Sequence, residues 1–354
     1  MLRFLNFNNQ KGLKEQRSLF SSCFPEHKDS TLSSNEYYFW KFHSFPTKNK
    51  SHEYAVYDGN SIIGYYAALP YRYSINGVHA ISGMVCDIMI HPLMRNKGIF
   101  TKLGEFATME LKKEGIAFTT GFPIRKEVIP GHLKIGWQIN FQLPLYICPL
   151  KANDILKSKK IAFFSPLVNC VLKALHIGLS WRNKTKLEIK SISSSEIDTF
   201  VEYESFLNKW TLNQKCYLIK TRDFLKWRLG AFQYNLTYLK KDSSIVALAI
   251  SRMVELNGVN SLALLDLMVL PEHIDCLPQL MVELRRQAKT CNVEVIVGMF
   301  SRFWARKYKL WRSGFVRSPF SFTFITKRLD NTISDQEFSR EDQWHLMWID
   351  SDDL

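Results

Sequence analysis

The sequence predicts a mixed α/β protein of the α+β kind, with two lobes that each contain a mixed, mostly antiparallel sheet flanked by helices. Three observations lead to this prediction. Hairpin signals come first in the chain and a strand–helix–strand crossover follows, an order that produces a mixed sheet. An apolar strand at 85–90 continues through a basic turn into a helix. Landmarks of this first part then recur after residue 188.

The first 75 residues alternate short strands and helices. Apolar periodicity and turn residues predict strands at 1–8, 53–58 and 61–73, and helices at 9–24 and 35–42. Asp58-Gly59-Asn60 forms the hairpin turn between the second and third strands, and Asn76-Gly77 forms the turn that follows. These strands are therefore expected to pair antiparallel.

The central strand and its crossover follow. We expect a strand at 79–91, a helix from Ile99 to about Glu114, a strand at 116–122, a short helix that ends at Gly136, and a strand at 138–148. Gly115 is the expected stop of the longer helix.

The turn between the central strand and the helix is basic and contains a glycine. Its sequence is Arg95-Asn96-Lys97-Gly98, and the helix opens at Ile99. The first amides of a helix have no partner within it, and the helix dipole favours negative charge at that end. Arg95 and Lys97 add full positive charges. This arrangement predicts a site for a phosphate or pyrophosphate group.

The order of elements and three short segments resemble the GNAT superfamily of acetyl-CoA-dependent N-acyltransferases over roughly residues 1–150. The segments are Ile88-Met89-Ile90-His91-Pro92, Arg95-Asn96-Lys97-Gly98 and Leu133-Lys134-Ile135-Gly136-Trp137. The family loop is Arg/Gln-x-x-Gly-x-Gly/Ala. Arg95 and Gly98 match this loop, whereas Phe100 stands at its final small position.

The resemblance implies that acetyl-CoA binds along this stretch as a co-substrate. The implied binding residues are Met89, Ile90, Arg95, Asn96, Lys97, Gly98, Ile99, Phe100 and Thr101. Amides and charges of the turn hold the pyrophosphate, and the Thr101 hydroxyl adds a contact. His91 and Cys86 have no partners at metal-ligand spacing, so no metal is expected.

Two residues are candidates for proton transfer. Asp87 lies in the middle of the apolar central strand, where a carboxylate is costly to bury, and is the candidate base. Its alternative role is structural, as a partner of the backbone or of a cation. His132 stands four residues before Gly136, where many GNAT proteins carry a tyrosine near the CoA sulfur, and is the candidate donor. The alternative is an ordinary histidine on a short helix. Glu127 and Tyr71 are further candidates.

Residues 151–187 differ from the lobes around them. The apolar run 161–181 carries a polar stripe at helical spacing, formed by Ser165, Asn169, Lys173, His176 and Ser180. This stripe predicts an amphipathic helix rather than a membrane span. Two interpretations stay open: a helix packed between two domains, or an interfacial membrane helix. The basic residues beside the run are Lys157, Lys159, Lys160, Arg182, Lys184 and Lys186.

A second copy of the pattern follows residue 188. Leu264–Pro271 echoes Val85–Pro92, with Asp, Met and Pro in common. Trp40-Lys41-Phe42, Asn76-Gly77-Val78, Gly121 and Gly136-Trp137 recur in order as Trp227-Arg228-Leu229, Asn257-Gly258-Val259, Gly298 and Gly314-Phe315. The predicted organisation is an acyl-CoA-binding lobe at 1–150, a helical linker at 151–187, a degenerate second lobe at 188–330 and an acidic segment at 331–354.

The second copy lacks the basic turn. Ile274-Asp275-Cys276-Leu277 stands where the first copy has Arg95–Gly98, without a glycine or a cation, and Asp275 would repel phosphate. The second lobe is therefore expected not to bind CoA. In the tail, 344–349 is expected to form a final strand. Asp350, Asp352 and Asp353 are expected in a solvated segment, with contact to a substrate amine as the alternative.

Composition narrows the classes of partner and the compartment. The formal charge of +14 favours an anionic partner, such as a phosphorylated cofactor, nucleic acid or a membrane face. Seven scattered cysteines without a CxxC pair speak against a disulfide framework or structural zinc and favour a reducing compartment. The first eight residues lack a signal-peptide core. The expected location is the cytoplasm, with peripheral membrane contact through 161–181 as an option.

Together these features predict an N-acyltransferase that transfers an acetyl group from acetyl-CoA to a primary amine. The tandem layout is similar to GNAT proteins of bacterial surface-polysaccharide synthesis, which implies an amino sugar as the small-molecule acceptor, and nucleic acid is not the expected partner. One alternative is a Fem-like aminoacyltransferase that uses charged tRNA, which the basic charge fits. The other is a non-catalytic GNAT-like binding module, which Phe100 supports.

Overall fold

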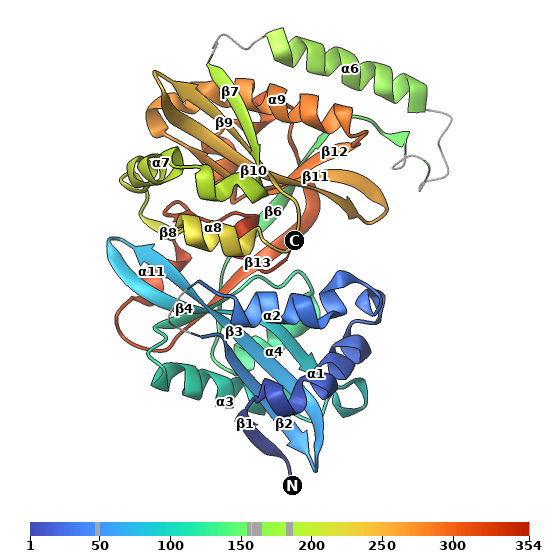
Figure 1. Cartoon of the computed structure of the whole chain (residues 1–354), viewed down its shortest axis with the longest axis vertical. Helices are drawn as coiled ribbons and strands as arrows, with labels where there is room; N and C mark the ends of the chain where they lie inside the picture. The colour runs from blue at the N-terminus through green and yellow to red at the C-terminus, as the bar shows by residue number, and fades with distance from the viewer. Residues whose placement is uncertain (47–49, 154–156, 158–164, 182–186, 354) are drawn as a thin grey trace. The chain divides into compact units, whose positions relative to one another are not determined.

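The computed structural model describes residues 1–46, 50–153, 157, 165–181 and 187–353. They form two compact units, and Figure 1 labels most of their helices and strands. Unit 1 comprises Met1–Phe141, Lys215–Ile219 and Thr323–Arg340, and unit 2 comprises Gln142–Gln214, Lys220–Phe322 and Glu341–Leu354. Both units combine helices with a mixed, mostly antiparallel sheet, so the predicted fold class is confirmed.

The sheet of unit 1 begins with four antiparallel strands that pair in sequence order. These are β1 (Arg3–Asn6), β2 (His52–Asp58), β3 (Ser61–Ile75) and β4 (Val78–Ile90). β5 (Phe118–Gly121) pairs parallel with β4 and antiparallel with the end of β13 (Val316–Arg328). The short β8 (Cys216–Leu218) pairs with the end of β3. Asn76 and Gly77 have φ values of 50° and 84°, which the predicted tight hairpin turn between β3 and β4 requires.

The helices of unit 1 are α1 (Asn9–Cys23), α2 (Asn35–His43), α3 (Ile99–Lys113), α4 (Ile129–Lys134) and α11 (Asp335–Ser339). α3 has a buried apolar stripe at helical spacing, formed by Ile99, Leu103, Ala107 and Leu111. This stripe belongs to the same core cluster as Val56 of β2, Ile63 of β3 and Ile90 of β4. The core therefore anchors α3 at the end of the central strand.

Unit 2 has a sheet with the same topology. Its strands, in spatial order, are β7 (Glu188–Ser193), β9 (Asn235–Lys241), β10 (Ser244–Leu256), β11 (Val259–Val269), β12 (Val295–Met299) and β6 (Gln138–Pro149). β11 and β12 are parallel and the other neighbours antiparallel, as in unit 1. Asn257 and Gly258 form the same turn as in unit 1, with φ values of 51° and 76°.

The helices of unit 2 are α6 (Ser165–Trp181), α7 (Glu202–Thr211), α8 (Arg222–Arg228), α9 (Leu277–Thr290) and α10 (Arg302–Lys307). α6 forms within the predicted amphipathic run, of which 161–164 lies outside the described residues. In the described part of the chain, no helix has the length and apolar character needed to cross a membrane.

The two sequence repeats exchange their last strands. β6 follows the first repeat, but its residues Leu145–Pro149 pair with β12 in unit 2. β13 follows the second repeat, but Ile325–Arg328 pair with β5 in unit 1. The compact units are therefore discontinuous along the chain. The division of the chain at 1–150, 151–187, 188–330 and 331–354 describes the sequence repeats and stays a prediction.

Residues 343–351 are buried, so the expectation of a solvated acidic tail is wrong for Asp350, whereas Asp353 is exposed. Trp344, Trp348 and Ile349 are 0–2% exposed, and Arg228 donates to the carbonyl oxygens of Ile349 and Ser351. The expected strand at 344–349 is limited to β14 (Trp344–His345), and a 3-10 helix at Trp348–Asp350 follows. The apolar side chains between the acidic residues explain this outcome, because burying them outweighs the tendency of the charges to stay in water.

Asp350 lies in a buried ionic cluster of unit 2. Lys220 Nζ is 2.8 Å from Asp266 Oδ2 and 3.8 Å from Asp350 Oδ2, and the three side chains are fully buried. Burial raises the pKa of Asp350 to about 6, and this effect outweighs the attraction of Lys220. Because the raised pKa favours the protonated carboxyl in the folded state, ionisation of Asp350 destabilises the fold.

We expect Asp350→Asn to remove a pH dependence of stability. The proton-linked stabilisation is present in the wild type below about pH 4 and lost as the pH rises through about 6. The free energy of unfolding of the wild type, relative to the variant, should therefore fall by about 2–3 kcal/mol across this interval. Urea unfolding at a series of pH values measures the difference, and a constant difference from pH 4 to 6 would contradict it.

Candidate functional site

The central strand β4 contains a bulge at Asp87. The pairing of β3 with β4 passes from Tyr65↔Met89 to Ala67↔Cys86, so Asp87 and Ile88 together face a single residue of β3. Asp87 has a φ of +47°, in the left-handed region that aspartate tolerates better than most residues. A bulge bends its strand and changes the direction of the side chains there. The candidate base thus lies at an irregularity of the sheet.

The carboxyl half of β4 extends past its ladder with β5. The register between these strands runs from Ser82↔Phe118 to Met84↔Thr120, whereas β4 continues to Ile90. The backbone of the last six residues of β4 therefore lies beyond the β5 ladder. Two sequence-predicted residues, Met89 and Ile90, are in this half, and their side chains are buried.

The turn after β4 leads directly to the N-terminus of α3. Asn96 and Gly98 have φ values of 62° and 73°, and Gly98 is the N-cap residue, without a side-chain cap. The first helical hydrogen bond runs from Lys102 N to Gly98 O. The amides of Ile99 to Thr101 therefore precede this bond, as expected of the first turn of a helix. This end of α3 is suited to an anion.

The two cations of the turn differ in their surroundings. Arg95 Nε donates to Ile90 O over 3.3 Å, which ties the start of the turn to the end of β4. The Arg95 charge also lies close enough to Cys23 to oppose the rise that burial causes in the pKa of that thiol. Lys97 is exposed, and its ammonium approaches Met94 Sδ. Arg95 therefore supports the turn, while Lys97 is open to a ligand.

The Phe100 ring lies against α4. A Cβ atom placed on Gly131 would be 2.6 Å from Phe100 Cε1, so the glycine makes room for the ring. Phe100 also meets His132 edge to face, with 5.2 Å between ring centroids. The residue that departs from the family loop is therefore accommodated by packing on a neighbouring helix.

His132 is a buried, neutral histidine. It is 5% exposed, and the Trp137 ring lies 4.8 Å away on a second side. Burial lowers the pKa of His132 to about 4, so the imidazole is uncharged at neutral pH. Within the described residues, its Nδ1 atom has no hydrogen-bond partner. His132 can therefore donate a hydrogen bond from the neutral ring, and its catalytic role stays a prediction.

Asp87 forms an ion pair that sequence reasoning missed. Lys41 Nζ of α2 lies 2.9 Å from Asp87 Oδ1, and the lysine and aspartate side chains are 5% and 14% exposed. This pair connects α2 to the bulge of β4. Asp87 is thus paired with a charged side chain, whereas the neighbours described for His132 are aromatic rings. Both candidate roles of Asp87, catalytic and structural, stay open.

A second carboxylate lies near the same aromatic helix. The hydroxyls of Tyr38 and Tyr65 each donate to Glu53 Oε2 over 2.5 Å, and His43 Nε2 lies 3.4 Å from Glu53 Oε1. Burial and the Glu53 charge raise the pKa of both tyrosines, so both remain hydrogen-bond donors. The Asp87 charge also acts on Tyr65. Asp87 and Glu53 therefore supply negative charge to one region of unit 1.

The lysines that pair with the two central-strand aspartates are equally far from them along the chain. The pair Lys41–Asp87 is separated by 46 residues, and the pair Lys220–Asp266 in unit 2 has the same separation. The two lysines are not equivalent landmarks of the repeat, because Trp40-Lys41-Phe42 is echoed by Trp227-Arg228-Leu229, so the sequence alone does not identify Lys41. Glu53 and its tyrosines have no identifying sequence signal either.

The second repeat lacks the open turn of the first. Pro271–Cys276 forms a 3-10 helix that runs directly into α9, and Cys276 and Leu277 are buried. Asp275 is exposed at this position. The N-terminus of α9 is thus preceded by helical turns rather than by a basic loop with a left-handed glycine. The expectation that CoA binds only in the first repeat stays a prediction.

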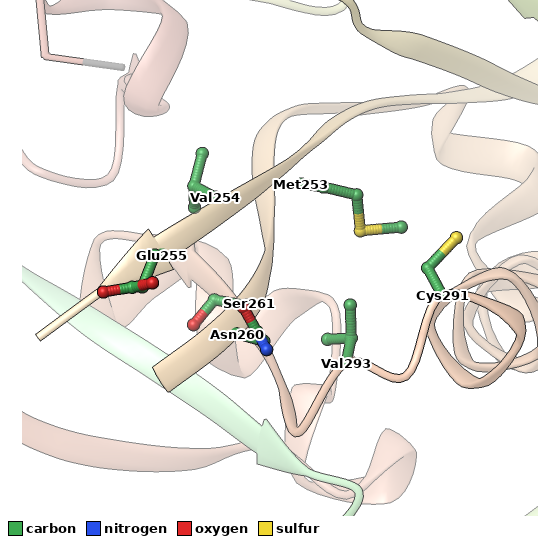
Figure 2. A pocket seen from close by; sticks show the side chains of 7 residues that line it. All are labelled: Met253, Val254, Glu255, Asn260, Ser261, Cys291 and Val293. Atoms are coloured by element: carbon green, nitrogen blue, oxygen red, sulfur yellow. The ribbon is translucent and has the colours of Figure 1, made fainter. Parts of the chain in front are cut away.

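A surface hollow in unit 2 has a different chemistry. Figure 2 shows its lining residues, which are Met253, Val254, Glu255, Asn260, Ser261, Cys291 and Val293. None of these seven residues is basic, and Glu255 is exposed. The hollow is therefore unsuited to a pyrophosphate. Among the residues described, no group of three or more His, Cys, Asp or Glu side chains could hold a metal ion.

Comparison with known proteins agrees with this geometry. Residues 8–139 match the family model described as an acetyltransferase (GNAT) domain. No curated protein matches the sequence.

Solved structures share the fold over both repeats. A GCN5-related N-acetyltransferase from Anabaena variabilis aligns with a TM-score of 0.65 and 12% identity over 93% of this chain and 73% of its own. A probable N-acyltransferase from Enterococcus faecalis aligns with a TM-score of 0.63 and 13% identity over the same shares. Saccharomyces cerevisiae N-myristoyltransferase with bound myristoyl-CoA aligns with a TM-score of 0.62 and 12% identity over 92% and 79%. At these identities the likeness is one of fold.

We expect Gly131→Ala to destabilise the protein by about 1–3 kcal/mol, because the new methyl group would overlap the Phe100 ring. In a Phe100→Ala background the same change should instead stabilise by about 0.5–1 kcal/mol, the helix preference of alanine over glycine. Chemical unfolding of the four proteins measures both effects. An equal effect of Gly131→Ala in both backgrounds would refute the proposed packing.

Proposed function

We propose that unit 1 is an N-acyltransferase that transfers an acetyl group from acetyl-CoA to a primary amine. The observation that carries this proposal is the continuous path from the bulge of β4, through the basic turn, to the uncapped N-terminus of α3. The GNAT match of residues 8–139 supports the same chemistry. The fold neighbours are an N-acetyltransferase, a probable N-acyltransferase and an N-myristoyltransferase, so the choice of acetyl as the acyl group is the more specific part of the proposal.

The pyrophosphate of the donor binds at the turn. Amides of Ile99, Phe100 and Thr101 donate to its oxygens, and Lys97 adds a positive charge. Arg95 positions the turn through Ile90 O and contributes a second charge. The thioester lies along the carboxyl half of β4, where backbone amides beyond the β5 ladder polarise its carbonyl.

Asp87 prepares the acceptor for attack. Its carboxylate attracts the ammonium form of the amine and takes one proton from it, directly or through a water molecule. The neutral nitrogen then attacks the thioester carbonyl carbon and the carbon–sulfur bond breaks. An amide and the CoA thiolate form as the nitrogen gives its second proton to solvent. Lys41 holds Asp87 Oδ1, which leaves Oδ2 for the amine.

The thiolate needs one proton to leave as a thiol. His132, with a pKa of about 4, is neutral before the reaction and donates a hydrogen bond from the imidazole ring rather than a proton from imidazolium. In this proposal the hydrogen bond stabilises the thiolate, and the proton released by the amine returns to the sulfur through solvent. His132 is therefore an auxiliary group, and Asp87 is the residue on which proton transfer depends.

The proposed acceptor is an amino sugar. Its support is the similarity of the tandem layout to GNAT proteins of surface-polysaccharide synthesis, together with the two carboxylates, Asp87 and Glu53, that favour a cationic amine. A charged tRNA donor is the competing assignment, and it predicts strongly salt-dependent binding of tRNA. A non-catalytic module predicts CoA binding without turnover.

We expect the wild type to bind acetyl-CoA in isothermal titration calorimetry with one site per chain. The Lys97→Glu/Gly98→Glu double variant should lose at least about tenfold in affinity, since it replaces a cation and a flexible glycine by two carboxylates. Lys112→Glu is the matched control, because it changes an exposed lysine at the other end of the same helix. Its affinity should equal that of the wild type.

Two further titrations separate the alternatives. Myristoyl-CoA that binds at least as tightly as acetyl-CoA would overturn the assignment of a short acyl group. Absence of acetyl-CoA binding to the wild type, combined with salt-dependent binding of aminoacyl-tRNA, would replace the proposed function by the Fem-like one.

We expect Asp87→Asn to lower kcat/KM for amine acetylation by about 10²–10⁴-fold, the usual contribution of a general base. Asparagine tolerates the left-handed backbone at this position, so the bulge should persist. The affinity for acetyl-CoA should stay close to that of the wild type, whereas the unfolding midpoint should fall, because the nearly buried Lys41 keeps its charge and loses its carboxylate partner. A variant with full activity would show that Asp87 is structural, as Asp266 is in unit 2.

A further inference from the structure

Helix α6 of unit 2 exposes an apolar face. Leu167, Val171, Leu175 and Ile177 are 66%, 61%, 48% and 48% exposed, and Ala174 and Gly178 between them are also exposed. At about 100° per residue, these six positions lie on one side of the helix. The charged residue of the described helix, Lys173, lies at the border of this face. A surface helix normally turns such a face toward the core.

The opposite face of α6 is polar and is fixed to unit 2. Asn169 accepts a hydrogen bond from Ala152 N and donates one to Asn153 Oδ1, over 2.9 and 2.8 Å. His176 Nε2 lies 2.8 Å from Pro149 O, and burial lowers its pKa, so the neutral ring donates this bond. These bonds fix the rotation of the helix. The apolar side is thereby held outward.

The segment around α6 is strongly basic. Residues 151–187 contain eight basic residues and one acidic residue, Asp154, a net charge of +7 that is half of the chain's formal +14. Lys157 and Lys173 are exposed. An apolar face bordered by cations matches an anionic lipid surface, where the side chains enter the boundary of the acyl chains and the cations meet the headgroups. A second copy of the segment would instead bring +7 against +7.

We propose that unit 2 binds the surface of an anionic membrane through α6. The helix lies in the plane of the membrane, with Leu167, Val171, Leu175 and Ile177 at the boundary between headgroups and acyl chains. The Asn169 and His176 bonds keep the other face on the protein. This proposal is independent of the proposed acyl transfer, because it involves neither the turn at 95–98 nor Asp87.

Vesicle co-sedimentation tests the proposal. The wild type should bind vesicles that contain phosphatidylglycerol, bind vesicles of pure phosphatidylcholine at least about tenfold more weakly, and release on addition of salt. Leu167→Ser/Val171→Ser/Leu175→Ser should weaken binding by at least about tenfold while leaving affinity for acetyl-CoA unchanged. Lys157→Glu/Lys173→Glu should weaken binding to the anionic vesicles. The matched control is Val201→Ser/Leu212→Ser/Trp311→Ser, three residues of unit 2 with exposures of 72%, 85% and 63%.

A fluorescent label tests the geometry directly. Cys170 and Cys291 are exposed, so a Cys291→Ser variant allows a polarity-sensitive dye to be attached to Cys170 on α6. Anionic vesicles should shift the dye emission to the blue, whereas a dye on Cys291 in a Cys170→Ser variant should not respond. Failure of the wild type to bind vesicles, binding by the triple serine variant equal to the wild type, or self-association through α6 without vesicle binding would overturn the proposal.

Discussion

An ion pair between a lysine and an aspartate lies at the central strand of each unit. In both units a lysine binds the aspartate of the repeated strand motif over a separation of 46 residues. In unit 2 the pair is fully buried and a third charge, Asp350, joins it, so breaking it would leave an uncompensated charge in the core. In unit 1 Asp87 keeps 14% of its side chain exposed on a bulge. The same pair is thus closed in one unit and accessible in the other.

Local features of the fold follow from the sequence, but strand partners do not. The turns Asn76-Gly77 and Asn257-Gly258 and the helix start at Ile99 depend on neighbouring residues, and the structure confirms them. The exchange of β6 and β13 between units depends on contacts across 146 or more residues, as in the pair Val295↔Pro149. The strands of the two repeats have the same alternation of apolar and polar residues. This pattern therefore does not determine whether a strand pairs within its own repeat or with the other repeat.

The candidate site likewise combines features that the local sequence predicts with contacts that it does not predict. The basic turn was predicted because backbone, glycine and charge act within four residues. Lys41 and Glu53 were missed because their roles depend on packing between α2 and the sheet. The tail was misassigned for a related reason: Asp350 was judged by its charge, whereas its position is set by the buried Trp344 and Trp348.

The net charge of +14 is distributed unevenly along the chain. Half of it lies in residues 151–187, around a helix whose exposed face is apolar rather than polar. Nucleic-acid surfaces favour cations distributed over a polar groove, whereas cations beside an apolar face fit a lipid headgroup layer. The N-terminus of α3 instead offers three backbone amides and two side-chain cations, a small site suited to a pyrophosphate. Under the two proposals the basic composition serves two separate anionic ligands, one in each unit, and tRNA is not required to explain it.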